Sequence, residues 1–70
     1  MRRRPVSSSA ISSLGYDPRS RTLEVEFRSG AVYDYSGVTP RLWASFLDAP
    51  SKGSFFARRI RGRFPFEPSR

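Results

Sequence analysis

The feature that most constrains this chain is a short segment of alternating residues, LEVEF, at positions 23–27. Apolar side chains at every second position alternate with charged ones, and this period of two predicts a half-buried β-strand. A chain of 70 residues has room for one small domain, which buries only roughly 60% of the surface of its unfolded chain. The strand is therefore expected in a small sheet that has one face covered.

Two further strands are predicted beside this one. The segment 11–16 is the less regular of the two, and Asp17 and Pro18 after it are typical turn residues. The segment 31–35 follows a turn that contains Ser29 and Gly30. The pattern predicts a three-stranded antiparallel meander.

The length of the second turn decides where Tyr33 and Tyr35 point. A two-residue loop of Ser29 and Gly30 would place both tyrosines on the solvent face with Glu24 and Glu26. A three-residue loop that also includes residue 28 would place them on the core face with the apolar residues of 23–27. We favour the second register, because it gathers every apolar residue except one on a single face.

A helix is predicted over residues 39–49, with Thr39 as the N-cap and Pro40 at the first helical position. Its apolar residues fall on one side, and its polar residues fall on the other. The apolar side consists of Leu42, Trp43, Phe46, Leu47 and Ala49. The expected fold class is α+β: a small three-stranded antiparallel meander packed against one amphipathic helix, plus a short basic C-terminal helix.

The basic helix is predicted within the stretch SKGSFFARRIRGRF, residues 51–64, which holds five of the thirteen basic residues and no acid. Ser54 is a candidate N-cap, and Gly62 follows the expected end near Arg61. On a helical wheel Phe56, Ala57 and Ile60 group together. The arginines at 58, 59 and 61 lie on the other side, with Phe55 among them.

Phe55 has two interpretations that the sequence leaves open. A phenyl ring between guanidinium groups suits a base-stacking platform, in which arginines contact the flanking phosphates. Alternatively, the arginine stems simply cover the ring. The preceding SKGS adds a weak anion-binding signal, with backbone amides at a helix start, Gly53 permitting close approach and Lys52 supplying charge.

The net charge of +7 and a pI near 11.3 point to a polyanionic partner, of which nucleic acid is the usual example. Twelve of the thirteen basic residues are arginine, a bias that a GC-rich genome also produces. Neither His nor Cys is present, which removes the usual general base, the thiol nucleophile and the usual zinc ligands. We therefore expect no enzyme activity, no metal and no cofactor.

The expected organisation is a flexible basic arm over residues 1–9, one domain over residues 10–66 and a tail over residues 67–70. Residues 64 and 66, both Phe, are two apart on one face of an edge strand or an extended tail, where Pro65 and Pro68 limit pairing. No apolar run approaches the roughly 20 residues that cross a bilayer. A cytoplasmic protein without a membrane partner is expected.

The ordered signals AISSLGYD, LEVEFRSGAVYDYSGV and APSKGSFFARRIRGRF resemble the KTSC domain. This family occurs as a C-terminal segment of some lysyl-tRNA synthetases and as small stand-alone bacterial and phage proteins. The resemblance covers residues 8–64, and its central mark is the Tyr-x-Tyr pair followed by Gly37 and Val38. It departs from the family at Ala57, where members often carry Asn. The resemblance implies the fold and suggests RNA binding.

The predicted function is a nucleic-acid-binding module for RNA or single-stranded DNA, with low sequence specificity. The expected contact residues are Tyr33, Tyr35, Lys52, Gly53, Phe55, Arg58, Arg59, Arg61 and Arg63. The alternative is a protein-interaction accessory module of a bacterial or phage complex, whose basic face meets an acidic protein partner. The oligomeric state is left open.

Overall fold

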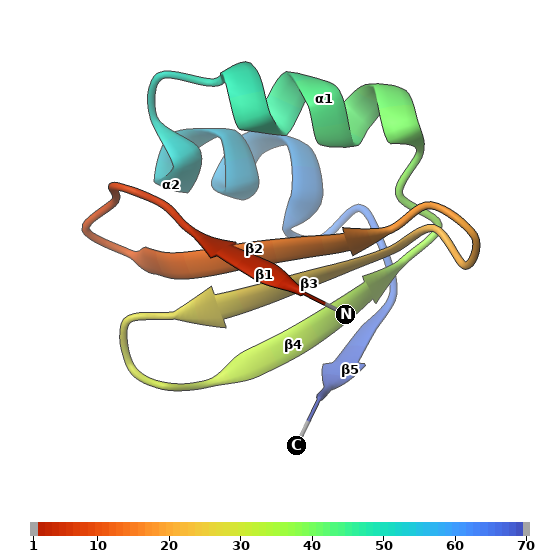
Figure 1. The fold of residues 1–70 in the computed structure, drawn as a ribbon, viewed down its shortest axis with the longest axis horizontal. Helices are drawn as coiled ribbons and strands as arrows, with labels where there is room; N and C mark the ends of the chain where they lie inside the picture. Colours follow the sequence, from red (N-terminus) through yellow and green to blue (C-terminus); the bar gives the residue numbers. More distant parts are fainter. Residues whose placement is uncertain (1, 70) are drawn as a thin grey trace.

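A continuous meander of β2 (Ile11–Asp17), β3 (Thr22–Phe27) and β4 (Val32–Ser36) forms the centre of the computed structural model, which describes residues 2–69. All strand pairs in the sheet are antiparallel, and the helical segments cover one face of it (Figure 1). The α+β class is as predicted. The sheet differs in detail, because within residues 2–69 it has five strands, in the order β1-β2-β3-β4-β5, rather than three.

The β3–β4 turn has the three-residue form. The amide of Phe27 donates to the carbonyl of Ala31 at 2.9 Å, so residues 28–30 form the loop, and Gly30 takes a left-handed φ of 97°. Tyr35 consequently pairs with Leu23, and residue 33 pairs with Val25. The favoured register is confirmed, and both tyrosines lie on the core face.

Two short edge strands extend the meander. Strand β1 (Arg3–Pro5) pairs with β2, and β5 (Phe66–Pro68) pairs with β4. The sequence prediction of a flexible arm over 1–9 is wrong for residues 3–5, and the predicted tail over 67–70 begins inside β5. Edge strands need backbone partners on one side only, so they require few apolar residues and tolerate proline. Met1 of the arm and Arg70 of the tail lie outside the described residues.

Helix α1 (Pro40–Asp48) begins as predicted. Thr39 is its N-cap, with the Oγ1 atom accepting from the amide of Leu42 at 3.2 Å, and Pro40 occupies the first turn. The apolar side faces the sheet, where Phe46 is fully buried. The predicted polar side, Arg41, Ser45 and Asp48, is exposed.

The basic helix begins three residues earlier than predicted and changes its geometry. Ser51, not Ser54, caps α2 (Lys52–Phe55), and its Oγ accepts from the amide of Ser54 at 3.2 Å. The chain continues as a π-helical turn, η1 (Phe56–Ile60), closed by a 2.8 Å bond from the Arg61 amide to the Phe56 carbonyl. The wider turn buries Phe56 and Ile60 and leaves Ala57 exposed, contrary to the helical-wheel grouping.

The core lies between the sheet and the helices. A β-bulge between Ile11 and Ser13 shifts the alternation of β2 by one residue, so Ile11 and Leu14 both face inward. This bulge explains the irregular pattern of the first predicted strand. The buried hydrophobic residues are Ile11, Leu14, Leu23, Val25, Tyr35, Val38, Phe46, Phe56 and Ile60.

Candidate nucleic-acid interface

Four exposed arginines lie on η1 and the segment that follows it, at positions 58, 59, 61 and 63. We call them the arginine surface. The Cζ atom of Arg59 lies 5.3 Å from the centroid of the Phe55 ring, and that of Arg61 lies 5.5 Å from the Phe56 ring. Arg63 donates from Nε to the carbonyl of Arg58 at 2.9 Å. Guanidinium groups held over rings remain free to bind phosphate through their N–H edges.

No carboxylate of residues 2–69 neutralises the arginine surface. The ion pair found among these residues joins Arg3 to Glu24. It lies on the face of the sheet opposite to the helices and the arginine surface. The arginines are thus available for an external anion.

Lys52 and Gly53 have contacts within the domain. The ammonium of Lys52 donates to the carbonyl of Ala49, near the end of α1, where a cation also interacts favourably with the helix dipole. Gly53 packs toward the loop before β2, where a Cβ atom would meet the Cβ of Ala10 at 3.7 Å. These two predicted contact residues therefore have roles in the fold.

Phe55 packs as part of the interior rather than standing free. Its ring stacks on Phe46, with centroids 5.0 Å apart and planes 14° apart, while Arg59 lies over it. These contacts occupy ring faces that a base would need. Of the two interpretations of Phe55, the geometry favours the covered ring.

The two predicted tyrosines differ in exposure. Tyr35 is 5% exposed, whereas Tyr33 is half-buried. Burial raises the pKa of the Tyr35 hydroxyl, and the nearby positive charge of Arg61 partly offsets the rise. The Arg61 guanidinium lies over Phe56, whose ring centroid is 5.4 Å from that of Tyr35.

Phe66 on β5 is an aromatic residue that the predicted contact set missed. It is 58% exposed, the one exposed large hydrophobic side chain among the described residues. Its ring centroid lies 5.6 Å from that of Tyr33 and 5.4 Å from that of Tyr35. The sequence signal for Phe66 was the Phe-x-Phe spacing of residues 64 and 66. Pro65 and Pro68 argued against a regular strand there, so this signal was not used. We call Tyr33, Tyr35 and Phe66 the aromatic edge.

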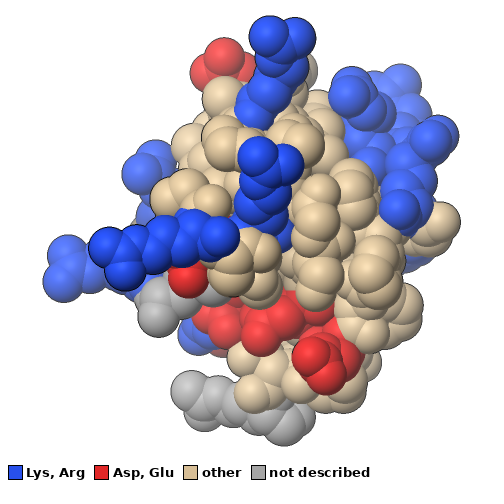
Figure 2. All heavy atoms as spheres, turned by 90° about the vertical axis from the view of Figure 1, so that its right-hand side faces the viewer, with Lys and Arg blue, Asp and Glu red and all other residues tan. Residues whose placement is uncertain are grey.

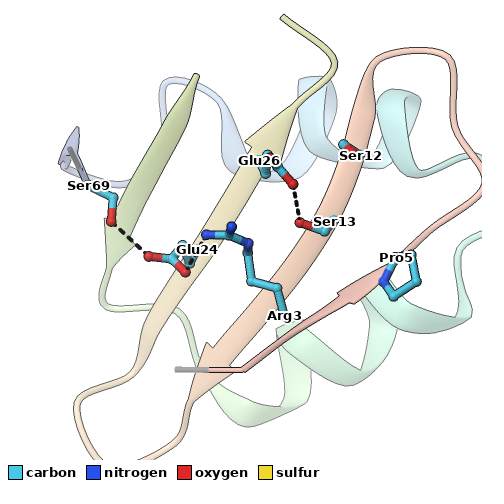
Figure 3. A pocket seen from close by; sticks show the side chains of 7 residues that line it. All are labelled: Arg3, Pro5, Ser12, Ser13, Glu24, Glu26 and Ser69. Carbon is cyan, nitrogen blue, oxygen red and sulfur yellow. Dashed lines mark hydrogen bonds and ion pairs between the residues drawn. The ribbon is translucent and has the colours of Figure 1, made fainter. Parts of the chain in front are cut away.

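The open face of the sheet carries carboxylates, together with the paired Arg3. Strand pairing aligns Glu24 with Asp34 and Asp34 with Glu67, across β3, β4 and β5, and we call these three residues the acidic row. Glu24 accepts from Arg3 at 2.9 Å and from Ser69 at 2.8 Å (Figure 3). Figure 2 shows carboxylates gathered in its lower half, with basic side chains spread above them.

Opposite pKa shifts mark the two inner carboxylates of the acidic row. Burial acts to raise the pKa of Glu24, but hydrogen bonds with Ser69, Asp34 and Arg3, together with the charge of Arg3, outweigh it, so the pKa is lowered. Burial raises the pKa of Asp34, and the neighbouring Glu24 carboxyl raises it further. One Asp34 oxygen, Oδ1, is buried without a hydrogen-bond partner.

A hollow beside Glu24, of about 580 Å³, lies on the open face of the sheet and is lined by residues of β1, β2 and β3 and by Ser69 (Figure 3). Most of the side chains that line it are polar or charged. The lining residues are Arg3, Pro5, Ser12, Ser13, Glu24, Glu26 and Ser69. Ser13 Oγ donates to Glu26 at 2.7 Å, so the lining groups largely satisfy one another. Among residues 2–69 no cluster of three or more His, Cys, Asp or Glu side chains is arranged to hold a metal ion.

Comparison with known proteins decides the family. The KTSC domain family matches residues 7–64, most of the chain and all of its central strands and helices. The chain belongs to the KTSC family. The resemblance stated from the sequence is confirmed.

Related KTSC proteins are found in several bacteria. An uncharacterized protein of Stutzerimonas stutzeri is 48% identical over 56 residues, which cover 80% of this chain and 79% of that protein. A lysine–tRNA ligase of Nostoc punctiforme is 42% identical over 59 residues, or 84% of this chain. The match spans only 10% of the ligase.

The fold is also known in a crystal structure of a KTSC domain protein from Yersinia pestis. It superposes with a TM-score of 0.94 at 48% sequence identity and covers 96% of this chain and 94% of that protein. No helix within residues 2–69 has the length and apolar character that crossing a membrane requires.

Proposed function

We propose that this KTSC domain binds single-stranded nucleic acid, RNA or DNA, with low sequence specificity. The observation that carries the proposal is the arginine surface, four exposed guanidinium groups with no carboxylate partner among the described residues. Each arginine that neutralises a phosphate releases a counterion, which favours binding at low salt. Phosphate contacts alone do not read bases, so little sequence preference is expected.

Charge separation supports the same function. The acidic row lies on the open face of the sheet, and the arginine surface lies on the helical side. A polyanion would approach the helical side and be repelled from the sheet side, which orients it on the domain. The lysine–tRNA ligases of Nostoc carry a related segment, and this similarity supports RNA as the partner class.

The test is fluorescence anisotropy of labelled single-stranded RNA, single-stranded DNA and a heparin fragment at several salt concentrations. In R58A/R59A two phosphate contacts are lost, so the slope of log affinity against log salt should fall by about 1.4 for a single strand. R19A/R41A is the matched control, because it also removes two exposed arginines but lies outside the arginine surface.

The slope of the control should stay near the wild-type value, and both double variants should melt as folded proteins. Equal slopes for R58A/R59A and the wild type would remove the arginine surface from the site. No binding of any oligonucleotide by the wild type would refute the proposal and turn the search to an acidic protein partner.

A further inference from the structure

The aromatic edge presents a phenyl ring that is exposed yet held in place. Phe66 is 58% exposed, although large apolar side chains of a small domain are normally needed in its core. Its ring meets Tyr33 edge-on, with planes at 82°, and lies tilted against Tyr35 at 32°. Tyr35 is held in turn by an edge-on contact with Phe56, at 5.4 Å. These ring contacts therefore hold the aromatic edge in place without a ligand.

A cation lies over Phe56, the ring that supports the aromatic edge through Tyr35. The guanidinium of Arg61 is 5.5 Å from the Phe56 ring, and its charge acts on the Tyr35 hydroxyl. Phe56 contacts Tyr35, and Tyr35 contacts Phe66, so a continuous set of ring contacts joins Arg61 to Phe66. The arginine surface and the aromatic edge are contiguous through Phe56 and Tyr35.

Carboxylates are kept away from the aromatic edge by strand alternation. Successive side chains of a strand point to opposite faces, so Asp34 and Glu67 lie on the open face of the sheet. Tyr35 and Phe66 are paired and lie on the helical side. An anionic ligand stacked on Phe66 would meet Arg61 rather than the acidic row.

We propose that Phe66 is the base-stacking subsite of this domain and takes an unpaired nucleotide of a single strand whose phosphates contact Arg61 and its neighbours. The proposal rests on the proposed function and replaces Phe55 as the stacking residue. An exposed aromatic face accepts any base, because every base has a π-face. A duplex, whose bases are stacked on each other, does not fit this site.

The experiment compares a labelled oligonucleotide with an abasic strand of equal length. Stacking on a protein aromatic ring corresponds to roughly 5- to 150-fold in affinity per base, so the wild type should prefer the oligonucleotide by a factor in this range. In F66A and F66L that preference should fall toward one while the salt dependence stays unchanged. F66W should retain the preference, and its additional tryptophan should be quenched by the oligonucleotide.

The outcomes separate this inference from the proposed function. If F66A and F66L keep the wild-type preference for the oligonucleotide, or if the wild type binds the abasic strand equally well, Phe66 is not the stacking subsite, and the arginine surface still stands. If the wild type binds neither strand, the proposed function itself fails. F66L keeps most of the apolar contact area with Tyr33 and Tyr35, so a folding defect in F66A does not decide the test.

Discussion

Replacing Asp34 with asparagine should stabilise the domain at neutral pH. Asp34 is the middle member of the acidic row, paired with Glu24 on one side and Glu67 on the other, and its Oδ1 atom is buried without a partner. Asparagine has nearly the same shape, removes the like charge and supplies an N–H donor to a neighbouring carboxylate.

The size of the effect follows from two contributions. A buried acceptor without a hydrogen bond costs about 1–3 kcal/mol. Two carboxylates about 5 Å apart repel by about 1 kcal/mol in a water-like dielectric. Because the face is partly open to solvent, we expect a gain in the free energy of unfolding of about 1–2 kcal/mol. Each 1 kcal/mol raises the Tm of a domain this small by roughly 4–8 °C.

The pKa of Asp34 gives the pH dependence its sign. The folded-state pKa is raised, so the folded protein holds this proton at pH values where the unfolded chain has lost it. The wild-type penalty is absent below the usual value of 3.8 and develops as the pH rises through the folded pKa. The advantage of D34N should therefore be full at neutral pH and small at about pH 3.

Urea unfolding of D34N and the wild type at both pH values measures this effect. D48N is the matched control, because it makes the same exchange at an exposed carboxylate outside the acidic row and should change stability by less than about 0.5 kcal/mol. A D34N protein that is no more stable than the wild type at neutral pH would refute the reasoning. So would a gain that is as large at low pH as at neutral pH.

Two other substitutions probe contacts that the sequence did not reveal. S69A removes the hydroxyl that donates to Glu24 and leaves the charges of the acidic row unchanged, so we expect a loss of about 1 kcal/mol at neutral pH and faster hydrogen exchange in β5 than in β3. Because the pKa of Glu24 is lowered, this loss should disappear as the pH falls through its folded value, which urea unfolding would detect. Y16F removes the hydroxyl that donates to the Val38 carbonyl, and a loss of about 1 kcal/mol is expected in the same assay. Unchanged stability in either protein would show that the contact adds nothing.

The central sheet and α1 were predictable because short-range rules determine them. The alternation over residues 23–27, the glycine at position 30 and the Thr39–Pro40 cap each act within a few residues. The edge strands were not predictable in this way. Arg3 contacts Glu24 across 21 residues, and Ser69 contacts it across 45, so β1 and β5 depend on partners that only the folded chain brings together.

Only part of the candidate site was predictable from short-range rules. Exposure of the arginines was predictable because charged side chains are rarely buried without a partner, although only Arg58 and Arg59 lie in the helical turn. The prediction of Phe55 as the stacking residue assumed a regular helix with 3.6 residues per turn. The π-helical turn and the earlier cap at Ser51 change the angular positions, so Phe55 packs on Phe46 instead of standing free. A helical wheel cannot anticipate a change in helical pitch.

The acidic row and the aromatic edge share strands β4 and β5 and lie on opposite faces of them. On β5 the period of two sends Phe66 to the helical side and Glu67 to the open face, and the Ser69 hydroxyl ties the end of the same strand to Glu24. The platform that we propose for a base is therefore positioned by a carboxylate contact on the opposite face. Glu24 therefore contacts both ends of the sheet, through Arg3 of β1 and through Ser69 directly after β5, and β5 carries Phe66.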